Sequence, residues 1–230
     1  DQREVELIKK SISTAGVLQF RINANSRDHA HIIDLAREVA QDPAKKRGRF
    51  LQDDSGEQIG LWARVGREQQ EGGGGNFKVP VANNTIRDAS TGDILDVSDF
   101  QDQGGDSDFT KYIAGRGIEE IDVLMATDDP YSVTGSHLGA VSRGNDERLR
   151  PCIMFNLKQA SGGVDRFAKL TTEFGPEGNF QRQLGIVLDN TLLSAPSIQE
   201  PITQGRGRIT GQFTKEEVDF MVNILEAGSL

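Results

Sequence analysis

Few residues of this chain have the types and spacing that chemistry requires. The 230 residues include three histidines and one cysteine. Ser194, Asp189 and His137 have the residue types of a hydrolase triad, in which a histidine base activates a serine and a carboxylate orients the histidine. However, Ser194 lies in Ser-Ala-Pro rather than in the Gly-x-Ser-x-Gly turn of α/β-hydrolases. The sequence therefore predicts no catalytic site, and a hydrolase is only the minor alternative.

A metal site has equally weak support. His29 and His31 are two residues apart in a predicted helix, so their side chains point roughly 200° apart at ~3.6 residues per turn and cannot chelate one ion together. His137 is distant, and Cys152 lies in the apolar run Cys-Ile-Met-Phe. We expect two solvated histidines, a buried and inert thiol, and no bound metal or cofactor. A single cysteine also excludes an internal disulfide.

Two loops resemble ligand-binding loops only in part. Gly72–Gly75 could suggest a phosphate cradle, but no Gly-Lys-Ser/Thr opens a helix after it. We instead expect Phe77–Val81 to be a strand that pairs with Ile59–Val65, with the glycines in the loop between them. The acidic stretch Gln101–Asp108 lacks the ligand spacing of an EF-hand, so we expect a solvated loop.

The charge excludes another class of function. The net charge is −9 and the isoelectric point is about 4.9, which argues against a nucleic-acid partner because phosphate binding needs clustered Lys and Arg. The short basic run at 45–47 is expected to be a solvated loop. The chain is 36% hydrophobic with 11 phenylalanines, enough for a substantial core, and no apolar run approaches the ~20 residues that cross a bilayer.

The last third of the chain has the clearest local signals. Leu184–Leu188 alternates like a strand, and Asp189-Asn190 both tolerate the left-handed backbone of a two-residue hairpin turn. The returning strand is Thr191–Ala195, and Pro196 should end it because proline donates no backbone hydrogen bond. A short strand follows around Arg208–Thr210.

A capped helix is predicted at the C-terminal end. Thr214 and Glu217 form a capping box, in which each side chain accepts the backbone N–H of the other residue. Val218, Met221, Val222 and Leu225 follow at helical spacing, so one face meets a core. Upstream, helices are expected at 1–15, at 26–41 with Ser26 as the cap, and at 161–174, and further strands at 17–22, 121–125, 140–145 and 151–157. Helices mixed with hairpins predict an α+β fold with a mainly antiparallel sheet.

Residues 183–230 also resemble the end of the extracytoplasmic region of SecD, an accessory subunit of the bacterial Sec translocon. That family has a run like "LAIVLDGxVxSAPxIxexIxgGxgxIsGxFtxeEAxxLAxxLraGaL". The chain differs from it at Asn190, Val218, Met221, Val222 and Glu226. The matching residues are Leu184, Ile186, Val187, Leu188, Asp189, Ser194, Ala195, Pro196, Ile198, Ile202, Gly205, Gly207, Ile209, Gly211, Phe213, Glu216, Glu217, Leu225, Ala227, Gly228 and Leu230.

The resemblance extends from residue 119 to residue 230 and suggests a division of the chain. Val133-Thr134-Gly135 resembles the family's "hTGxxL", and Gly163 to Thr171 resembles "GaxrFxxlT". Residues 1–24 resemble the last helix and strand of the ferredoxin-like base, and 117–230 the head, with a C-terminal helix that leads to a membrane helix in the family. Residues 25–116 do not match and are expected to be an elaboration or insertion. The chain is therefore expected to be a piece of a longer membrane protein.

The resemblance implies a non-enzymatic role. The region would lie on the periplasmic side of the inner membrane, with SecF, the Sec channel complex and an unfolded preprotein as partners. The family is thought to couple the proton gradient to preprotein movement, through residues in membrane helices that this chain lacks. A purely structural spacer in the complex is the other open interpretation.

A mobile head would also need a hinge. The resemblance places one connection between base and head near Ile22–Asn25 and the other near Gly211–Phe213. Two connections at one neck are a common layout for a hinge, since few residues absorb the rotation. The hinge candidates are Asn25 and Gly211; the residues that contact a substrate are unknown.

Overall fold

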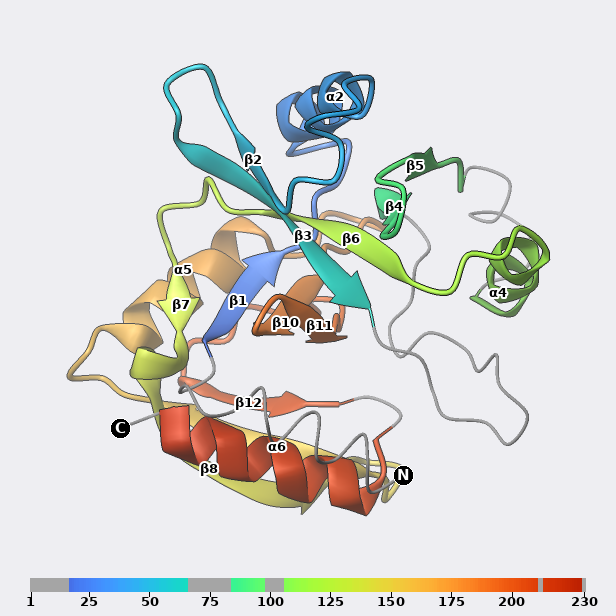
Figure 1. The fold of residues 1–230 in the computed structure, drawn as a ribbon. Helices are drawn as coiled ribbons and strands as arrows, with labels where there is room; N and C mark the ends of the chain where they lie inside the picture. The colour runs from blue at the N-terminus through green and yellow to red at the C-terminus, as the bar shows by residue number, and fades with distance from the viewer. Residues whose placement is uncertain (1–16, 66–83, 98–105, 211–212, 229–230) are drawn as a thin grey trace.

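A computed structural model describes residues 17–65, 84–97, 106–210 and 213–228, and it has the α+β class that the sequence predicts (Figure 1). The α-helices are α2 (Ala30–Val39), α4 (Asp106–Gly115), α5 (Gly163–Glu173) and α6 (Lys215–Gly228), with a short 3₁₀ helix η1 (Gly135–His137). The strands are β1 (Leu18–Ile22), β2 (Phe50–Gln52), β3 (Gln58–Val65), β4 (Ile86–Asp88), β5 (Ile94–Leu95), β6 (Ile121–Ala126), β7 (Val133–Thr134), β8 (Leu138–Asn145), β9 (Pro151–Leu157), β10 (Leu184–Leu188), β11 (Thr191–Ser194) and β12 (Arg206–Ile209).

The larger sheet joins the two halves of the chain. Its strands lie in the order β5-β4-β6-β3-β11-β10-β1-β7, and β2 pairs with β3. All pairs are antiparallel except β11 with β3, where Thr191 lies opposite Arg64. The expected mainly antiparallel sheet is therefore confirmed. The one parallel pair connects the hairpin β10–β11 to the strands of residues 50–126.

The predicted hairpin is confirmed in its strands and its turn. β10 and β11 pair antiparallel, and Asp189 and Asn190 have φ angles of 49° and 63°. The Asp189 carboxylate also accepts the backbone N–H of Val17 at 2.9 Å, which ties the turn to the start of β1. All five residues of β10 are buried because the sheet is covered on both faces.

A second, three-stranded sheet has the order β12-β9-β8, and α6 packs against β8 and β9 (Figure 1). The capping box at the start of α6 is confirmed: Thr214 donates its backbone N–H to Glu217 at 3.0 Å, and Glu217 donates its own to the Thr214 hydroxyl at 3.2 Å. The predicted apolar stripe of α6 is buried, with Val222 fully inaccessible. The strand expected at 208–210 lies slightly earlier, at Arg206–Ile209.

Three groups of buried side chains form the core. The largest contains Phe20, Phe155 and Phe167, whose ring centroids are 5.2 to 6.1 Å apart, and it joins β1 and β10 to the second sheet, α5 and α6. A second group lies on the other face of the larger sheet beneath α4, and includes Phe109 and Val187. A third joins α2 to β2, β3 and β6.

Some local expectations were wrong. The helix expected from Ser26 begins at Ala30, and Ser26 does not cap it; instead the Asn25 side chain accepts the backbone N–H groups of Arg27 and Asp28. Asp106 belongs to helix α4 rather than to a loop. The expected helix 1–15, the strand 77–81 and the loop Gly72–Gly75 lie outside the described residues, while β3 pairs with β2, β6 and β11.

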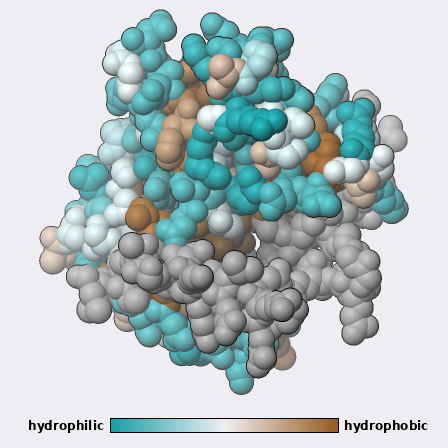
Figure 2. Space-filling view, in the orientation of Figure 1, coloured by the Kyte–Doolittle hydropathy of each residue, from teal (hydrophilic) through white to brown (hydrophobic). Residues whose placement is uncertain are grey.

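The described surface is mostly polar. Figure 2 shows mostly hydrophilic side chains on the described part of one face, with smaller hydrophobic areas among them. In the described part of the chain, the large hydrophobic residues that are exposed lie on different segments: Val17, Phe50, Leu149 and Met154. Among the described helices, none has the length and apolar character needed to cross a membrane.

Candidate functional site

The three residues of the conceivable triad are engaged with different partners. Ser194, at the end of β11, donates its hydroxyl to the carbonyl of Thr210 at 2.5 Å. His137 accepts the backbone N–H of Thr134 at its Nδ1, 3.1 Å away, and Asp189 holds the hairpin turn. No contact joins any two of them within the described part of the chain. Each therefore has a structural role at its own position.

The histidine expectations are corrected in part. His31 is exposed and lies 2.9 Å from Asp128, but His29 is buried, 3% exposed, with its ring stacked on Phe174 at 5.7 Å. Burial lowers the pKa of His29, against the attraction of Asp128 and Asp28. Among the residues that the structure describes, no group of three or more His, Cys, Asp or Glu could hold a metal ion.

The expectation of a buried thiol is confirmed. Cys152 is inaccessible to solvent, and burial raises the pKa of its thiol. Its sulfur lies 4.0 Å from that of Met154. A thiol with a raised pKa carries little thiolate at neutral pH, so Cys152 is a poor nucleophile.

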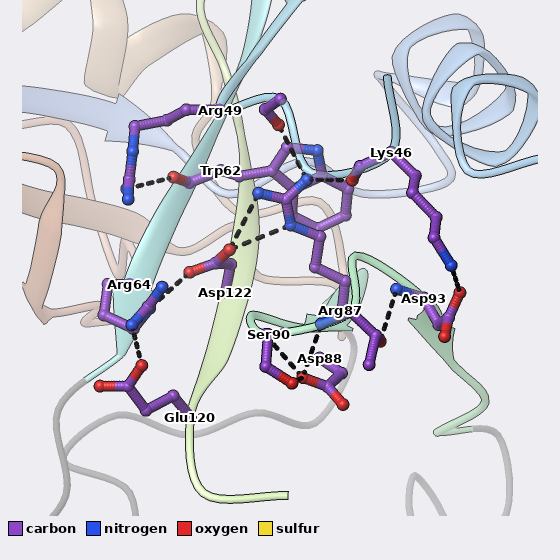
Figure 3. A network of polar contacts seen from close by, with 12 residues as sticks. Lys46, Arg49, Trp62, Arg64, Arg87, Asp88, Ser90, Asp93, Glu120 and Asp122 are labelled. Atoms are coloured by element: carbon purple, nitrogen blue, oxygen red, sulfur yellow. Dashed lines mark hydrogen bonds and ion pairs between the residues drawn. The ribbon is translucent and has the colours of Figure 1, made fainter. Parts of the chain in front are cut away.

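A buried network of charges joins strands β3 and β4 to strand β6 (Figure 3). Asp122 on β6 is 1% exposed, and its two carboxylate oxygens accept hydrogen bonds from Arg64 at 2.7 Å and Arg87 at 3.0 Å. Arg87 also donates to the carbonyls of Lys46 and Gly48 at 2.9 and 2.8 Å. Three segments distant in sequence therefore meet at one carboxylate.

Electrostatics favour a structural role for this network. The Arg87 guanidinium lies over the ring of Trp62, 4.5 Å from its centroid. Burial lowers the pKa of Arg87, against the attraction of Asp122. Burial also acts to lower the pKa of Arg64, but its bonds to Asp122 and Glu120 outweigh this and raise it. Both carboxylate oxygens of Asp122 are engaged by arginines and the side chain is buried, so we assign Asp122 a role in packing rather than in catalysis.

A second ion pair fixes the start of α2. Arg182 is 4% exposed and donates to both carboxylate oxygens of Asp28, at 2.6 and 2.8 Å, as well as to Glu177 at 2.7 Å. The hydrogen bond from Arg182 lowers the pKa of Asp28 and raises that of Arg182. Bidentate pairing of this kind fixes direction as well as distance, so it ties α2 to the loop before β10.

The proposed hinge residue Asn25 lies beside this pair. The backbone N–H groups of Asn23 and Ala24, just before it, donate to Gln183 at 3.0 Å and to Leu124 at 2.9 Å. Rotation of the chain at Asn25 would either break both of these hydrogen bonds or move their acceptor residues with it. Gly211, the other hinge candidate, lies outside the described residues, so the hinge stays a prediction.

A surface groove follows strand β12. It is a groove of about 1120 Å³ between β12, the turn 146–150 and the loop 196–204. A smaller depression of about 260 Å³ lies beside it, over the outer face of the three-stranded sheet at Ala140, Ser142, Met154 and Asn156. Arginines from two segments face the groove: Arg148, Arg150, Arg206 and Arg208.

Sequence reasoning missed both the arginine groove and the Asp122 network. Arg206 and Arg208 alternate with Gly207, which is a local sign of a strand with one charged face. No comparable signal connects Arg148 to these two residues. Arg148 and Arg206 are 58 positions apart in the sequence, and they come together only because β9 pairs with β12. Asp122 gave no signal beyond its place in an apolar strand.

Fold and surface together define the class as an α+β domain with two mainly antiparallel sheets and a charged groove along a sheet edge. The family described as SecDF, P1 head subdomain, matches residues 116–230, half of the chain. The chain belongs to this family. The resemblance found in the sequence is thereby confirmed.

Individual relatives support the same assignment. The protein translocase subunit SecD of Leptotrichia buccalis is 39% identical over 101 residues, and that of Rickettsia prowazekii is 36% identical over 98 residues. These matches cover 44% and 43% of this chain but only 23% and 18% of the relatives. The chain therefore spans about a fifth of the length of the curated relatives that it matches.

Solved structures of SecDF are also similar, at low sequence identity. A structure titled as a membrane component SecDF that enhances protein export has 16% identity and a TM-score of 0.38, with 93% of this chain and 94% of that chain covered. The SecDF of Thermus thermophilus, titled as a translocon-associated membrane protein, has 17% identity and a TM-score of 0.36, with 94% and 29% covered.

Proposed function

We propose that this chain is the periplasmic head of a SecD subunit and that it binds an unfolded preprotein as the preprotein emerges from the Sec channel. The observation that carries the proposal is the family match over residues 116–230. In the intact protein this region would lie outside the inner membrane, with SecF and the channel complex as partners. The proton gradient would act through membrane helices elsewhere in the intact protein. The head would bind the preprotein and release it.

The surface of the molecule supports a binding role. An unfolded chain exposes backbone groups and alternating side chains, and it is bound by sheet edges and grooves rather than by catalytic groups. The described residues offer a long groove beside a sheet edge, and the conceivable catalytic residues Ser194, Asp189 and His137 are separated. We therefore propose a non-enzymatic function.

Crosslinking in the intact translocase tests this proposal. A photoreactive amino acid is placed at exposed head positions, for example at Arg148 or Asn156, and on the opposite side at Arg37. A preprotein arrested during export should crosslink to a subset of head positions. If no head position crosslinks to the arrested preprotein while the channel does, the head is a structural spacer and the proposal is wrong.

The proposed hinge gives a second test. Cysteines at Asn25 and Gly211 of the intact protein would form a disulfide across the neck if the two connections lie close together. Cys152 is buried and should not interfere. Oxidation should then slow export while the fold is retained, and reduction should restore it. Equal export by the oxidised and reduced proteins would refute the hinge.

A further inference from the structure

Strand β12 has an open edge. Among the described residues it pairs only with β9, and Arg206 lies opposite Asn156. The backbone N–H of Leu157 donates to the carbonyl of Gly205 at 2.7 Å. In an antiparallel pair, alternate residues direct their backbone groups to the partner strand. Gly205, Gly207 and Ile209 therefore face β9.

The backbone groups of Arg206 and Arg208 consequently point away from the sheet. No hydrogen bond joins them to another described segment. Thr210 is two residues after Arg208, so its backbone groups also point away from β9. Its carbonyl accepts a hydrogen bond from the Ser194 hydroxyl, as this direction predicts. Within the described residues, the edge has a partner at Thr210 and none at Arg206 and Arg208, along the groove of about 1120 Å³. An open edge of this kind is a template for an added strand.

The charged residues of the groove indicate what kind of peptide could bind there. The side chains of Arg206 and Arg148 have no ion pair or hydrogen bond in the part of the chain that the structure describes, although the whole chain carries a net charge of −9. Arg208 has only a surface pair with Glu147 at 3.1 Å. Asp146 is committed to its own turn, where it accepts the N–H groups of Arg148 and Arg150. Glu200 also lines the groove, so its four arginines and three carboxylates leave a net charge of +1, on the side of Arg148 and Arg206.

The opposite wall of the groove has an apolar part beside the inward-facing side of β12, formed by Leu184, Pro196, Ile198 and Ile202, of which Leu184 and Ile198 are buried. Polar residues of the same segment line the rest of this wall: Ser197, Gln199, Glu200, Thr203 and Gln204. Successive side chains of a strand point to opposite faces of the sheet. A strand added to β12 would therefore place one set of side chains beside Arg206 and Arg208 and the alternate set toward the apolar part of the opposite wall.

We propose that β12 binds an extended polypeptide segment in which acidic and apolar residues alternate, by adding it as a fourth strand to the β12-β9-β8 sheet. This inference rests on the proposed function and names the class of substrate segment that the head prefers. A second copy of the chain fits less well, because pairing of two β12 edges would bring their arginines together and like charges opposite each other are destabilising.

Fluorescence anisotropy with synthetic peptides tests the inference on the chain itself. The probe is a labelled nonapeptide of alternating Glu and Val, and the control is the same peptide with Lys in place of Glu. We expect saturable binding of the Glu peptide only, and weaker binding at higher salt because the charges are exposed. Arg206→Glu should weaken it by about tenfold or more. Arg37→Glu, the same change on an exposed arginine of α2, should leave it unchanged.

Two N-methylated peptides test the backbone bonds. Methyl groups are placed on the amides of either the Glu or the Val residues, so each peptide loses the donors of one strand edge. If the peptide is added as a strand, only one of its two edges bonds to β12, so only one of the two methylated peptides should lose binding. Equal effects of both, equal binding of the Lys peptide, or no binding at all would overturn the inference. Arg206-dependent self-association in analytical ultracentrifugation would also overturn it in favour of a second copy. Preprotein crosslinks elsewhere on the head would still support the proposed function in each of these cases.

Discussion

Removal of the Asp122 carboxylate should destabilise the fold strongly. In Asp122→Ala, Arg64 and Arg87 lose their shared partner, and the Arg87 side chain is only 5% exposed, so water cannot replace the carboxylate easily. Breaking a buried ion pair by removing one partner costs about 3–5 kcal/mol. We expect a loss of this size in the free energy of unfolding.

Urea unfolding followed by the fluorescence of Trp62 measures this loss, since the only tryptophan of the chain stacks on Arg87. Asp34→Ala is the control: its pair with Arg37 is 72% and 65% exposed, so the cost should be below about 0.5 kcal/mol. Arg87→Met added to Asp122→Ala should cost about 1–3 kcal/mol less than the sum of the single changes. A cost for Asp122→Ala below about 1 kcal/mol would refute the assigned role of the network.

Two further predictions concern single side chains. Thr214→Ala should lower the free energy of unfolding by about 1 kcal/mol, because the N–H of Glu217 loses the hydroxyl at 3.2 Å; an unchanged urea midpoint would show that the cap contributes nothing. His29 has a pKa below its ordinary value because burial favours the neutral ring. As the pH falls, His29 is therefore protonated in the unfolded chain before it is protonated in the folded chain. The free energy of unfolding should fall as the pH drops from about 7, through the ordinary histidine pKa of about 6.5, toward the lower pKa of His29 in the folded chain. His29→Gln should therefore make the urea midpoint depend less on pH between 7.5 and 5.5, because the pKa of the neighbouring Asp28 is lowered and lies below this range. An unchanged dependence of the midpoint on pH would contradict the assignment.

Features with local causes were predictable from the sequence. The hairpin depends on two adjacent residues that accept a positive φ, Asp189 and Asn190, and the cap of α6 on two residues three apart, Thr214 and Glu217. The alternation and helical spacing around them depend on neighbours within one or two turns. The α+β class and the family resemblance followed from these signals.

Local patterns also failed where a stronger competing contact existed. Ser26 is a good cap by residue type, but the Asn25 side chain binds the following N–H groups first, and the helix begins at Ala30. His29 reads as a polar helix residue, but its ring is covered by Phe174 from a segment about 145 residues later in the numbering. A sequence window contains neither the partner nor the burial that it causes.

The tertiary structure alone decided which distant residues meet. Asp122 is joined to Arg64 and Arg87 because β6 lies between β3 and β4. Arg148 and Arg206 line one groove because β12 pairs with β9, and the phase of that pairing turns the backbone groups of Arg206 and Arg208 away from β9. The sequence of a strand determines how its side chains alternate, but strand order and register depend on the packing of the whole core, so the edge of β12 could be found only in the folded chain.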